Sequence, residues 1–310
     1  MNIILAGKLN WTKEEIKILS RNNNIIYSPN EEVELTIEPD TIDIIICNWF
    51  FKYHDIRKFK NLKFIQLLSV GYNGIDTKIV KEMGITLYNA KDVYSIPISE
   101  FVIGNLLAYY KHLSFFIQNK NKHKWEKNRT LQELYSKKIL IVGTGSIGTE
   151  IAKRLTVFTN NIFGCNRTIR ETPYFIKVYP INNLSEIISR FDVLILSVAL
   201  TEETKYLINK TIFNKMTHNT IIVNISRGAV IEEKELVSAL LKNKINGAIL
   251  DVFEEEPLPE DSPLWNMENV ILTPHNSFIS DRTNERLKKT IVQNYLEWEK
   301  HNGKGENRMD

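Results

Sequence analysis

The segment that decides the fold of this chain is Lys138-Ile139-Leu140-Ile141-Val142-Gly143-Thr144-Gly145-Ser146-Ile147-Gly148. Its apolar first half predicts a buried strand, and residues 149–155 after it predict a helix. Glycines spaced as G-x-G-x-x-G join the two elements. In a strand–turn–helix setting this spacing is typical of a dinucleotide-binding turn: the first glycine permits the turn, the second admits the pyrophosphate and the third lets the helix pack closely. A tight turn without a ligand is the alternative interpretation.

Short apolar runs alternate with helical segments on both sides of this turn, a pattern typical of parallel sheets with crossover helices. The expected strands cover residues 3–6, 25–27, 44–47, 64–68 and 85–88 before the turn, and 138–142, 162–165, 193–198, 221–225, 248–251 and 270–272 from it onward. A helix over about 99–117 is expected between the two series, and another over about 282–300 after them. The pattern predicts an α/β protein with two doubly wound units. We place the first domain at residues 1–98, completed by the C-terminal helix in 280–310, and the second at 99–279; the polar tail His301–Asp310 is expected to fray.

The strand at 162–165 is followed by Asn166-Arg167-Thr168-Ile169-Arg170, and no carboxylate occurs before Glu171. NAD sites usually place an acidic residue there to bind the ribose 2′-hydroxyl. Two guanidinium groups and a hydroxyl suit a 2′-phosphate better, because arginine binds phosphate through charge-assisted, bidentate hydrogen bonds. We therefore predict NADP(H) as the cofactor, with NAD(H) as the alternative, and Asn166, Arg167, Thr168 and Arg170 as its contacts.

Three residues that could carry chemistry stand in order between positions 225 and 277. Arg227, Glu256 and His275 each follow a short apolar run that predicts a strand. The carboxyl ends of parallel strands converge on the crevice where open α/β folds bind ligands. A cation, a carboxylate and an imidazole gathered there could bind an anionic substrate, tune a proton donor and deliver the proton. Taken singly, each is more often a surface, solvated or structural residue.

Length and composition narrow the classes of protein. The 310 residues suit two domains, and a net charge of +3 with scattered basic residues argues against nucleic-acid binding. No apolar run approaches the ~18–20 residues of a membrane span. The short, uncharged start is unlike a signal peptide. Cys47 and Cys165 suit buried free thiols in a reducing compartment better than a disulfide. These features predict a cytoplasmic protein, and no metal site is expected.

Several ordered motifs resemble those of the D-isomer-specific 2-hydroxyacid dehydrogenase family over nearly the whole chain. The segment Ser69-Val70-Gly71-Tyr72-Asn73-Gly74-Ile75-Asp76 is similar to the family's substrate loop, and Ser95-Ile96-Pro97-Ile98-Ser99-Glu100 to the start of its interdomain helix. Trp125 with residues 133–138, Leu200 to Thr204, Ser226 to Pro257, and Pro274-His275 match further motifs. The chain departs from the family at Ala199, where proline is common, and at Asn276-Ser277-Phe278, where small residues are common.

The resemblance implies two Rossmann-like domains with a cleft between them, namely a flavodoxin-like substrate domain and a dinucleotide-binding domain. It also implies nicotinamide hydride transfer and, usually, a homodimer. Arg227 would bind the substrate carboxylate and keto oxygen, His275 would exchange the proton, and Glu256 would hydrogen-bond His275 and keep it charged near neutral pH. The remaining implied contacts are the backbone N–H groups of Val70 and Gly71 for the substrate carboxylate, Gly143, Gly145, Ser146, Ile147 and Gly148 for the pyrophosphate, Val198, Ile225 and Ser226 along the cofactor groove, and Asp251 and Ser277 for the nicotinamide amide.

The substrate prediction depends on Asn48 and Trp49, which follow a strand of the first domain and are expected to face the substrate's side group. The segment Asn48-Trp49-Phe50-Phe51 is largely aromatic and has no basic residue before Lys52, which argues against a pocket for a phosphorylated substrate. We expect reduction of a small 2-oxo acid, glyoxylate or hydroxypyruvate. An NAD-dependent 3-phosphoglycerate or other D-2-hydroxyacid dehydrogenase is the first alternative, and a dinucleotide-sensing, corepressor-like binding protein the second. Trp49 as a core or interface residue also remains open.

Overall fold

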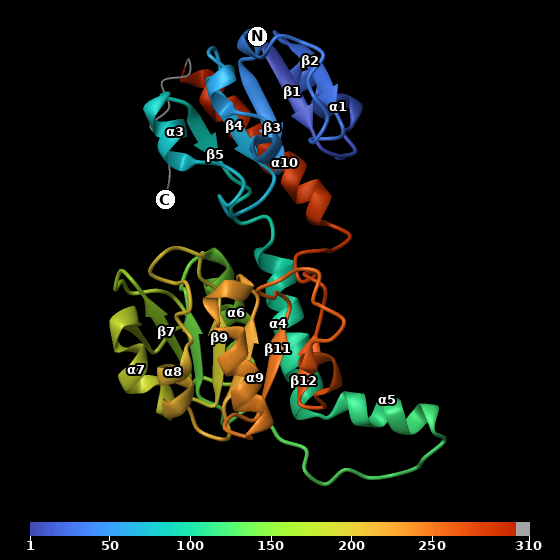
Figure 1. The fold of residues 1–310 in the computed structure, drawn as a ribbon, viewed down its shortest axis with the longest axis vertical. Helices are drawn as coiled ribbons and strands as arrows, with labels where there is room; N and C mark the ends of the chain where they lie inside the picture. The colour runs from blue at the N-terminus through green and yellow to red at the C-terminus, as the bar shows by residue number, and fades with distance from the viewer. Residues whose placement is uncertain (302–310) are drawn as a thin grey trace. The chain divides into compact units, whose positions relative to one another are not determined.

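The computed structural model describes residues 1–301. Its residues divide into two compact units, each built around its own parallel sheet (Figure 1). Unit 1 comprises Met1–Val93 and the segment from Ser280 on, and unit 2 comprises Tyr94–Ile279. The predicted fraying of the tail His301–Asp310 falls, beyond His301, outside the described residues.

Unit 1 holds a five-stranded parallel sheet in the order β2-β1-β3-β4-β5. Its strands are β1 (Asn2–Ala6), β2 (Asn24–Ser28), β3 (Ile44–Cys47), β4 (Phe64–Leu67) and β5 (Thr86–Tyr88). This is the flavodoxin-like order, in which loops at the carboxyl ends of the strands form the ligand edge. The expected flavodoxin-like fold of this part of the chain is confirmed.

The helices of unit 1 are α1 (Lys13–Leu19), α2 (Phe50–Tyr53), α3 (Thr77–Glu82) and α10 (Thr283–Lys300), with 3₁₀ turns at Pro39–Thr41 and Ile56–Lys58. The C-terminal α10 packs on the sheet although it is distant in sequence. Asn294 donates a hydrogen bond to the side-chain oxygen of Gln66 at 2.8 Å, and Trp298 lies against Phe64 with ring centroids 5.1 Å apart. Burial of apolar side chains on α10 therefore completes the core of unit 1.

Unit 2 holds a seven-stranded parallel sheet in the order β12-β11-β10-β9-β6-β7-β8. The strands are β6 (Ile139–Val142), β7 (Ile162–Asn166), β8 (Lys177–Pro180), β9 (Val193–Leu196), β10 (Ile221–Asn224), β11 (Gly247–Leu250) and β12 (Val270–Leu272). The direction of winding reverses between β6 and β9, so the crevice at their carboxyl ends is the expected ligand site of such a sheet. The expected Rossmann-like fold is confirmed.

Helices cover both faces of this sheet. They are α4 (Ser95–Tyr110), α5 (Leu113–Asn121), α6 (Ser146–Leu155), α7 (Leu184–Ile187), α8 (Lys210–Lys215) and α9 (Glu233–Leu241), with 3₁₀ turns at Ile181–Asn183, Ile188–Arg190, Gly228–Val230 and Pro263–Asn266. Alternate residues of β6 enter opposite layers: Ile139 and Ile141 pack with α4 and α6, whereas Leu140 and Val142 pack with α8 and α9. A strand buried on both faces explains why this segment reads as a continuous apolar run.

Two details of the sequence prediction are wrong. The single helix expected over 99–117 is two helices, because His112 adopts a left-handed φ of 48° between α4 and α5. Leu113, the first residue of α5, is 46% exposed. The strand β8 was not predicted: it is a short edge strand that begins with a lysine and ends with a proline, both typical of edges and weak as strand signals.

Within the described residues, no helix combines the length and apolar character that crossing a bilayer requires.

Candidate active site

The glycine turn between β6 and α6 has the geometry of a phosphate-binding turn. Gly143 has a φ of +96°, and a Cβ there would lie 2.2 Å from the carbonyl oxygen of Ser197. A Cβ on Gly148 would lie 2.0 Å from the carbonyl oxygen of Gly143, so the third glycine allows α6 to approach the strand. Gly145, at the N-cap of α6, has open space where its side chain would be. Each position thus requires glycine for a different physical reason. The open space at Gly145, at the start of α6, is where a pyrophosphate group could approach the backbone.

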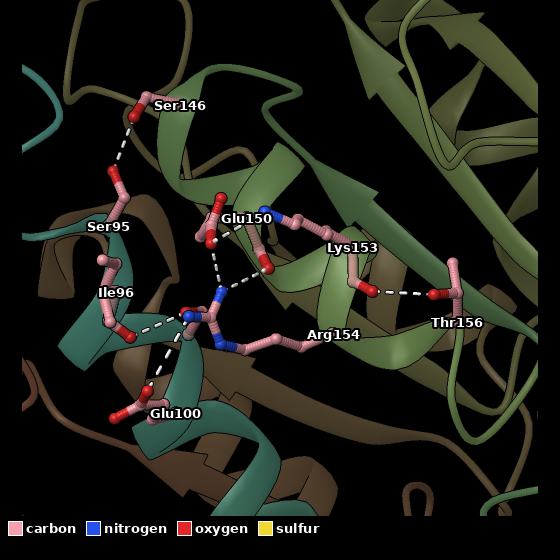
Figure 2. Close-up of polar contacts among 9 residues, drawn as sticks. Ser95, Ile96, Glu100, Ser146, Glu150, Lys153, Arg154 and Thr156 are labelled. Carbon is pink, nitrogen blue, oxygen red and sulfur yellow. Dashed lines mark hydrogen bonds and ion pairs between the residues drawn. The ribbon is translucent and has the colours of Figure 1, made fainter.

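The first residue of α6 is linked to the first residue of α4. The hydroxyls of Ser146 and Ser95 lie 2.5 Å apart, and Figure 2 shows them pointing toward each other from the two helix starts. About two turns further along, Arg154 of α6 pairs with Glu150 of its own helix and with Glu100 of α4, the latter at 3.7 Å. These contacts hold the two helices in register, so the hydroxyl of Ser146 has a fixed position at the phosphate turn.

The end of β7 is tied to the same turn. Asn166 donates from its side-chain amide to the hydroxyl of Thr144 at 3.0 Å and accepts from the backbone N–H of Arg167 at 3.0 Å. The side chains of Arg167, Thr168 and Arg170 are exposed. The structure therefore places Asn166 at the glycine turn and leaves the two guanidinium groups exposed to solvent, with Arg167 close enough to Glu203 for their charges to interact.

The segment after β10 is rigid around the predicted arginine. The side-chain oxygen of Asn224 accepts from the N–H of Ser226 at 3.1 Å and from its hydroxyl at 2.7 Å, and the amide of Asn224 donates to the carbonyl of Arg227 at 3.0 Å. Ile225 and Ser226 are buried, and Val198 is half-buried next to Gly143. Burial lowers the pKa of the Arg227 guanidinium, and the negative charge of Glu256 opposes that shift. The arginine is thus held close enough to Glu256 for their charges to interact.

The histidine predicted to exchange the proton is paired with the predicted carboxylate. Nδ1 of His275 lies 2.8 Å from Oε2 of Glu256, while Oε1 of Glu256 accepts from the N–H of Phe253 at 3.1 Å. A carboxylate on Nδ1 favours the tautomer with hydrogen there and leaves Nε2 for a substrate. Arg227, Glu256 and His275 follow the adjacent strands β10, β11 and β12, so the structure brings all three predicted catalytic residues to one edge of the sheet.

The backbone of His275 is unusual for a residue with a side chain, with a φ of 50°. Its N–H donates to the carbonyl of Asp251 at 2.8 Å. The fully buried carboxylate of Asp251 accepts from the hydroxyl of Thr273 at 2.7 Å and from the N–H groups of Asn276 and Ser277 at 2.7 and 3.0 Å. Asp251 therefore anchors the turn that presents His275. Its predicted contact with the nicotinamide amide, and that of the buried Ser277, stay predictions.

One aromatic ring packs against the histidine, and a second ring packs against the first. Phe278 meets the ring of His275 edge to face at a centroid distance of 5.9 Å, and the ring of Tyr94 at 5.7 Å. Edge-to-face packing limits the rotation of the imidazole. Phe278, at a position where small residues are common in the family, thus helps to orient the ring of the predicted proton donor.

The remaining predicted residues lie in unit 1, at the carboxyl ends of its strands. Val70 and Gly71 follow β4, where Asn89 donates to the carbonyl of Val70 and the hydroxyl of Ser69 donates to that of Gly71, both at 2.8 Å. Asn48 follows β3, next to Trp49. Trp49 is 44% exposed, so it is not a core residue of unit 1.

Three residues with structural roles at these sites were absent from the predicted set. Ser95 was quoted only as part of a helix start, and Asn224 and Thr144 were not singled out. No local signal marks them, because their partners at Ser146, Ser226 and Asn166 become neighbours only in the folded chain. An uncharged polar residue beside a motif is the strongest hint that the sequence offers.

Comparison with known proteins identifies the family. Residues 103–277 match the model of the D-isomer specific 2-hydroxyacid dehydrogenase NAD-binding domain. The chain belongs to the D-isomer-specific 2-hydroxyacid dehydrogenases. It is 32% identical over 294 residues to a hydroxypyruvate reductase of Thermotoga maritima, covering 93% of this chain and 92% of that protein. It is 36% identical over 239 residues to a D-3-phosphoglycerate dehydrogenase of Methanocaldococcus jannaschii, which covers 76% of this chain but only 45% of that longer protein.

Solved structures support the same family and fold. An NADPH-dependent glyoxylate/hydroxypyruvate reductase from Sinorhizobium meliloti, in complex with NADP and malonate, superposes with a TM-score of 0.82 at 27% identity, over 96% of this chain and 93% of that one. The predicted family, fold and enzyme class are confirmed, and the cofactor is a nicotinamide dinucleotide. Its preference for NADP or NAD and the identity of the substrate are subjects of proposal.

Proposed function

We propose that this protein reduces a small 2-oxo acid with NADPH, either glyoxylate to glycolate, which is achiral, or hydroxypyruvate to D-glycerate. The observation that carries the proposal is the pair formed by His275 and Glu256 at 2.8 Å, at the same sheet edge as Arg227, because the three residues follow the consecutive strands β12, β11 and β10. The relatives named as glyoxylate or hydroxypyruvate reductases support the substrate class. In this proposal unit 1 is the substrate domain and unit 2 the dinucleotide-binding domain.

The chemistry follows from these residues. The bound dinucleotide would supply the hydride, held by the glycine turn, Ser146 and the residues after β9 and β10. Negative charge builds on the substrate carbonyl oxygen as the ketone is reduced. Arg227 stabilises that charge and the substrate carboxylate, and Nε2 of His275 donates the proton to the oxygen. Glu256 stabilises the protonated imidazole, and the N–H groups of Val70 and Gly71 bind the substrate carboxylate.

A product analysis tests this function. The protein is incubated with NADPH and hydroxypyruvate, and the glycerate formed is resolved by chiral chromatography. We expect the D isomer alone, because a fixed donor and a fixed hydride face permit one stereochemical outcome. The L isomer or a racemate would contradict the proposal.

The preference for NADPH is proposed from the exposed arginines after β7. A charge-assisted hydrogen bond contributes about 1.5–3 kcal/mol, equivalent to roughly 10–100-fold in affinity. We therefore expect Arg167→Ala to weaken NADPH binding by that factor in fluorescence titrations and to change NADH binding by less than about twofold. Arg190→Ala, which removes another exposed guanidinium of unit 2, is the control. Equal losses for both nucleotides would reject the 2′-phosphate contact.

We also propose a homodimer located in the cytoplasm. Figure 1 shows α5 and the coil after it extending from the sheet of unit 2. The exposed fractions of Leu113, Ile117 and Trp125 are 46%, 59% and 99%, so three large apolar side chains of this segment are available to bury against a second copy of the chain. The two free, buried cysteines suit a reducing compartment.

The dimer is tested by a charge on this surface. Ile117→Asp combined with Trp125→Ala is expected to halve the mass measured by analytical ultracentrifugation, because a buried unpaired carboxylate is costly. Val157→Asp, at another exposed apolar residue of unit 2, is the control and leaves the mass unchanged. A double variant that keeps the mass of the native protein would place the interface elsewhere.

A further inference from the structure

The side chain of Glu31 binds the turn that follows β3. Its Oε1 accepts the backbone N–H of Asn48 and its Oε2 that of Trp49, both at 2.6 Å. The carbonyl oxygen of Glu31 also lies 2.9 Å from Nε2 of His54, at the end of the same segment. A carboxyl group that accepts through both oxygens is in its charged form. Glu31 is therefore a fixed negative charge rather than a mobile surface carboxylate.

This charge lies at the ligand edge of unit 1. Oε1 of Glu31 is 3.5 Å from the position that a Cβ on Gly7 would take, and Gly7 follows β1. Asn48 follows the neighbouring strand β3. Burial raises the pKa of the Cys47 thiol at the end of β3, and the charge of Glu31 raises it further. The carboxylate thus acts on the carboxyl ends of two central strands, where open α/β sheets bind their ligands.

The turn held by Glu31 touches the predicted substrate loop. A Cβ on Gly74 would lie 3.0 Å from Cε3 of Trp49 and 3.2 Å from the carbonyl oxygen of Asn48. The loop that carries Val70 and Gly71 therefore packs directly on the indole ring. The side group of a substrate whose carboxylate is bound at Val70 and Gly71 would meet the surface formed by Trp49, Asn48 and Glu31.

The negative charge of Glu31 is close enough to the loop after β4 to act on a charged ligand there. Neighbouring strands are about 4.8 Å apart, so the carboxylate at the end of β3 is within roughly 10 Å of the loop after β4. That separation is comparable to the Debye length of about 8 Å at physiological ionic strength. Both partners of the carboxylate are neutral peptide groups, which fix it but leave its net charge in place. The nearest lysine along the turn, Lys52, has its ammonium 5.9 Å from the centroid of the Tyr53 ring.

We propose that Glu31 determines substrate specificity by excluding 2-oxo acids whose side group is anionic, such as phosphorylated ones. The carboxylate common to all 2-oxo acids binds elsewhere and does not discriminate among them. Side groups that are neutral, as in glyoxylate and hydroxypyruvate, meet no repulsion. This inference rests on the proposed function and adds the residue that separates the reductase from the 3-phosphoglycerate alternative.

The test compares kcat/KM for hydroxypyruvate with kcat/KM for its 3-phosphate ester. The native protein is expected to have the higher kcat/KM for hydroxypyruvate. Glu31→Gln is expected to lower the ratio of the two kcat/KM values about tenfold, equivalent to about 1.4 kcal/mol. Glu32→Gln is the matched control: it removes one negative charge from the adjacent, exposed residue and leaves the ratio unchanged. The ratio separates charge from a general loss of activity, because a disturbed loop would slow both substrates.

A second measurement covers the case in which Glu31→Gln does not fold. In the native protein, raising the ionic strength from about 10 mM to 500 mM is expected to lower the ratio of kcat/KM for hydroxypyruvate to kcat/KM for its phosphate ester, because the Debye length falls several-fold. A native protein that uses both substrates equally, or a ratio that neither Glu31→Gln nor salt changes, would overturn the role of Glu31 alone. Absence of turnover with both glyoxylate and hydroxypyruvate would instead overturn the proposed function, and this inference with it.

Discussion

Replacing His275 with asparagine is expected to lower turnover of hydroxypyruvate by about 10²–10⁴-fold, the usual contribution of general acid catalysis. Asparagine is chosen because position 275 has a φ of 50°, a conformation that asparagine adopts more readily than alanine. The side chain of His275 is 39% exposed, so its removal costs little stability. Dinucleotide affinity and the melting temperature are expected to stay close to those of the native protein, measured by titration and calorimetry.

Glu256→Gln distinguishes the contribution of the carboxylate from that of the imidazole in the pair of Glu256 and His275. Glutamine keeps an acceptor for the N–H of Phe253 but loses the charge that stabilises a protonated His275. Turnover is expected to fall less than in His275→Asn, because the imidazole itself remains, and initial rates with hydroxypyruvate measure the difference. Native turnover in His275→Asn would show that another group donates the proton.

Gly228→Ala is expected to destabilise the protein by on the order of 3 kcal/mol or to prevent folding. A Cβ at this position would lie 1.8 Å from the carbonyl carbon of Phe253 and 2.3 Å from the backbone nitrogen of Glu254. Both obstacles are backbone atoms, so no side chain can move aside. The same contact joins the turn of Arg227 to the loop of Glu256, and any surviving protein is expected to lose activity as well. Denaturant unfolding measures the first effect and initial rates the second.

Gly104→Ala is the control for this substitution. Gly104 lies inside α4 with open space around its missing side chain, so alanine there is expected to raise stability by about 0.5–1 kcal/mol through helix propensity. Unfolding free energies for Gly228→Ala and Gly104→Ala that agree within error would contradict the close packing described at Gly228.

The features that the sequence predicts well are those encoded in consecutive residues. The strand Ile139–Val142 and the glycine turn after it appear as one uninterrupted pattern, and the structure confirms both. The adjacency of Arg227, Glu256 and His275 was predictable because each follows a strand, and parallel strands end at one edge. The break at His112 was not predictable, because apolar residues continue at helical spacing across it.

Contacts between residues that are distant in the chain could not be predicted from the sequence. The motif assigns Asp251 to a cofactor contact, which stays a prediction, and it gives no sign that the buried carboxylate also holds the turn after His275. Glu31 lies in an acidic run that resembles any solvated loop, and only the folded chain brings it to the N–H groups of Asn48 and Trp49. In both cases the role depends on backbone groups, which are the same in every residue and leave no mark in the pattern of side chains.

The most direct test of the account is the initial rate of nucleotide oxidation by the native protein with hydroxypyruvate, comparing NADPH with NADH at equal concentration. We predict turnover with both nucleotides and a rate with NADPH at least about tenfold higher than the rate with NADH. An equal or higher rate with NADH would contradict the assignment of Arg167 and Arg170 to a 2′-phosphate. No turnover with either nucleotide would contradict the proposed reductase itself.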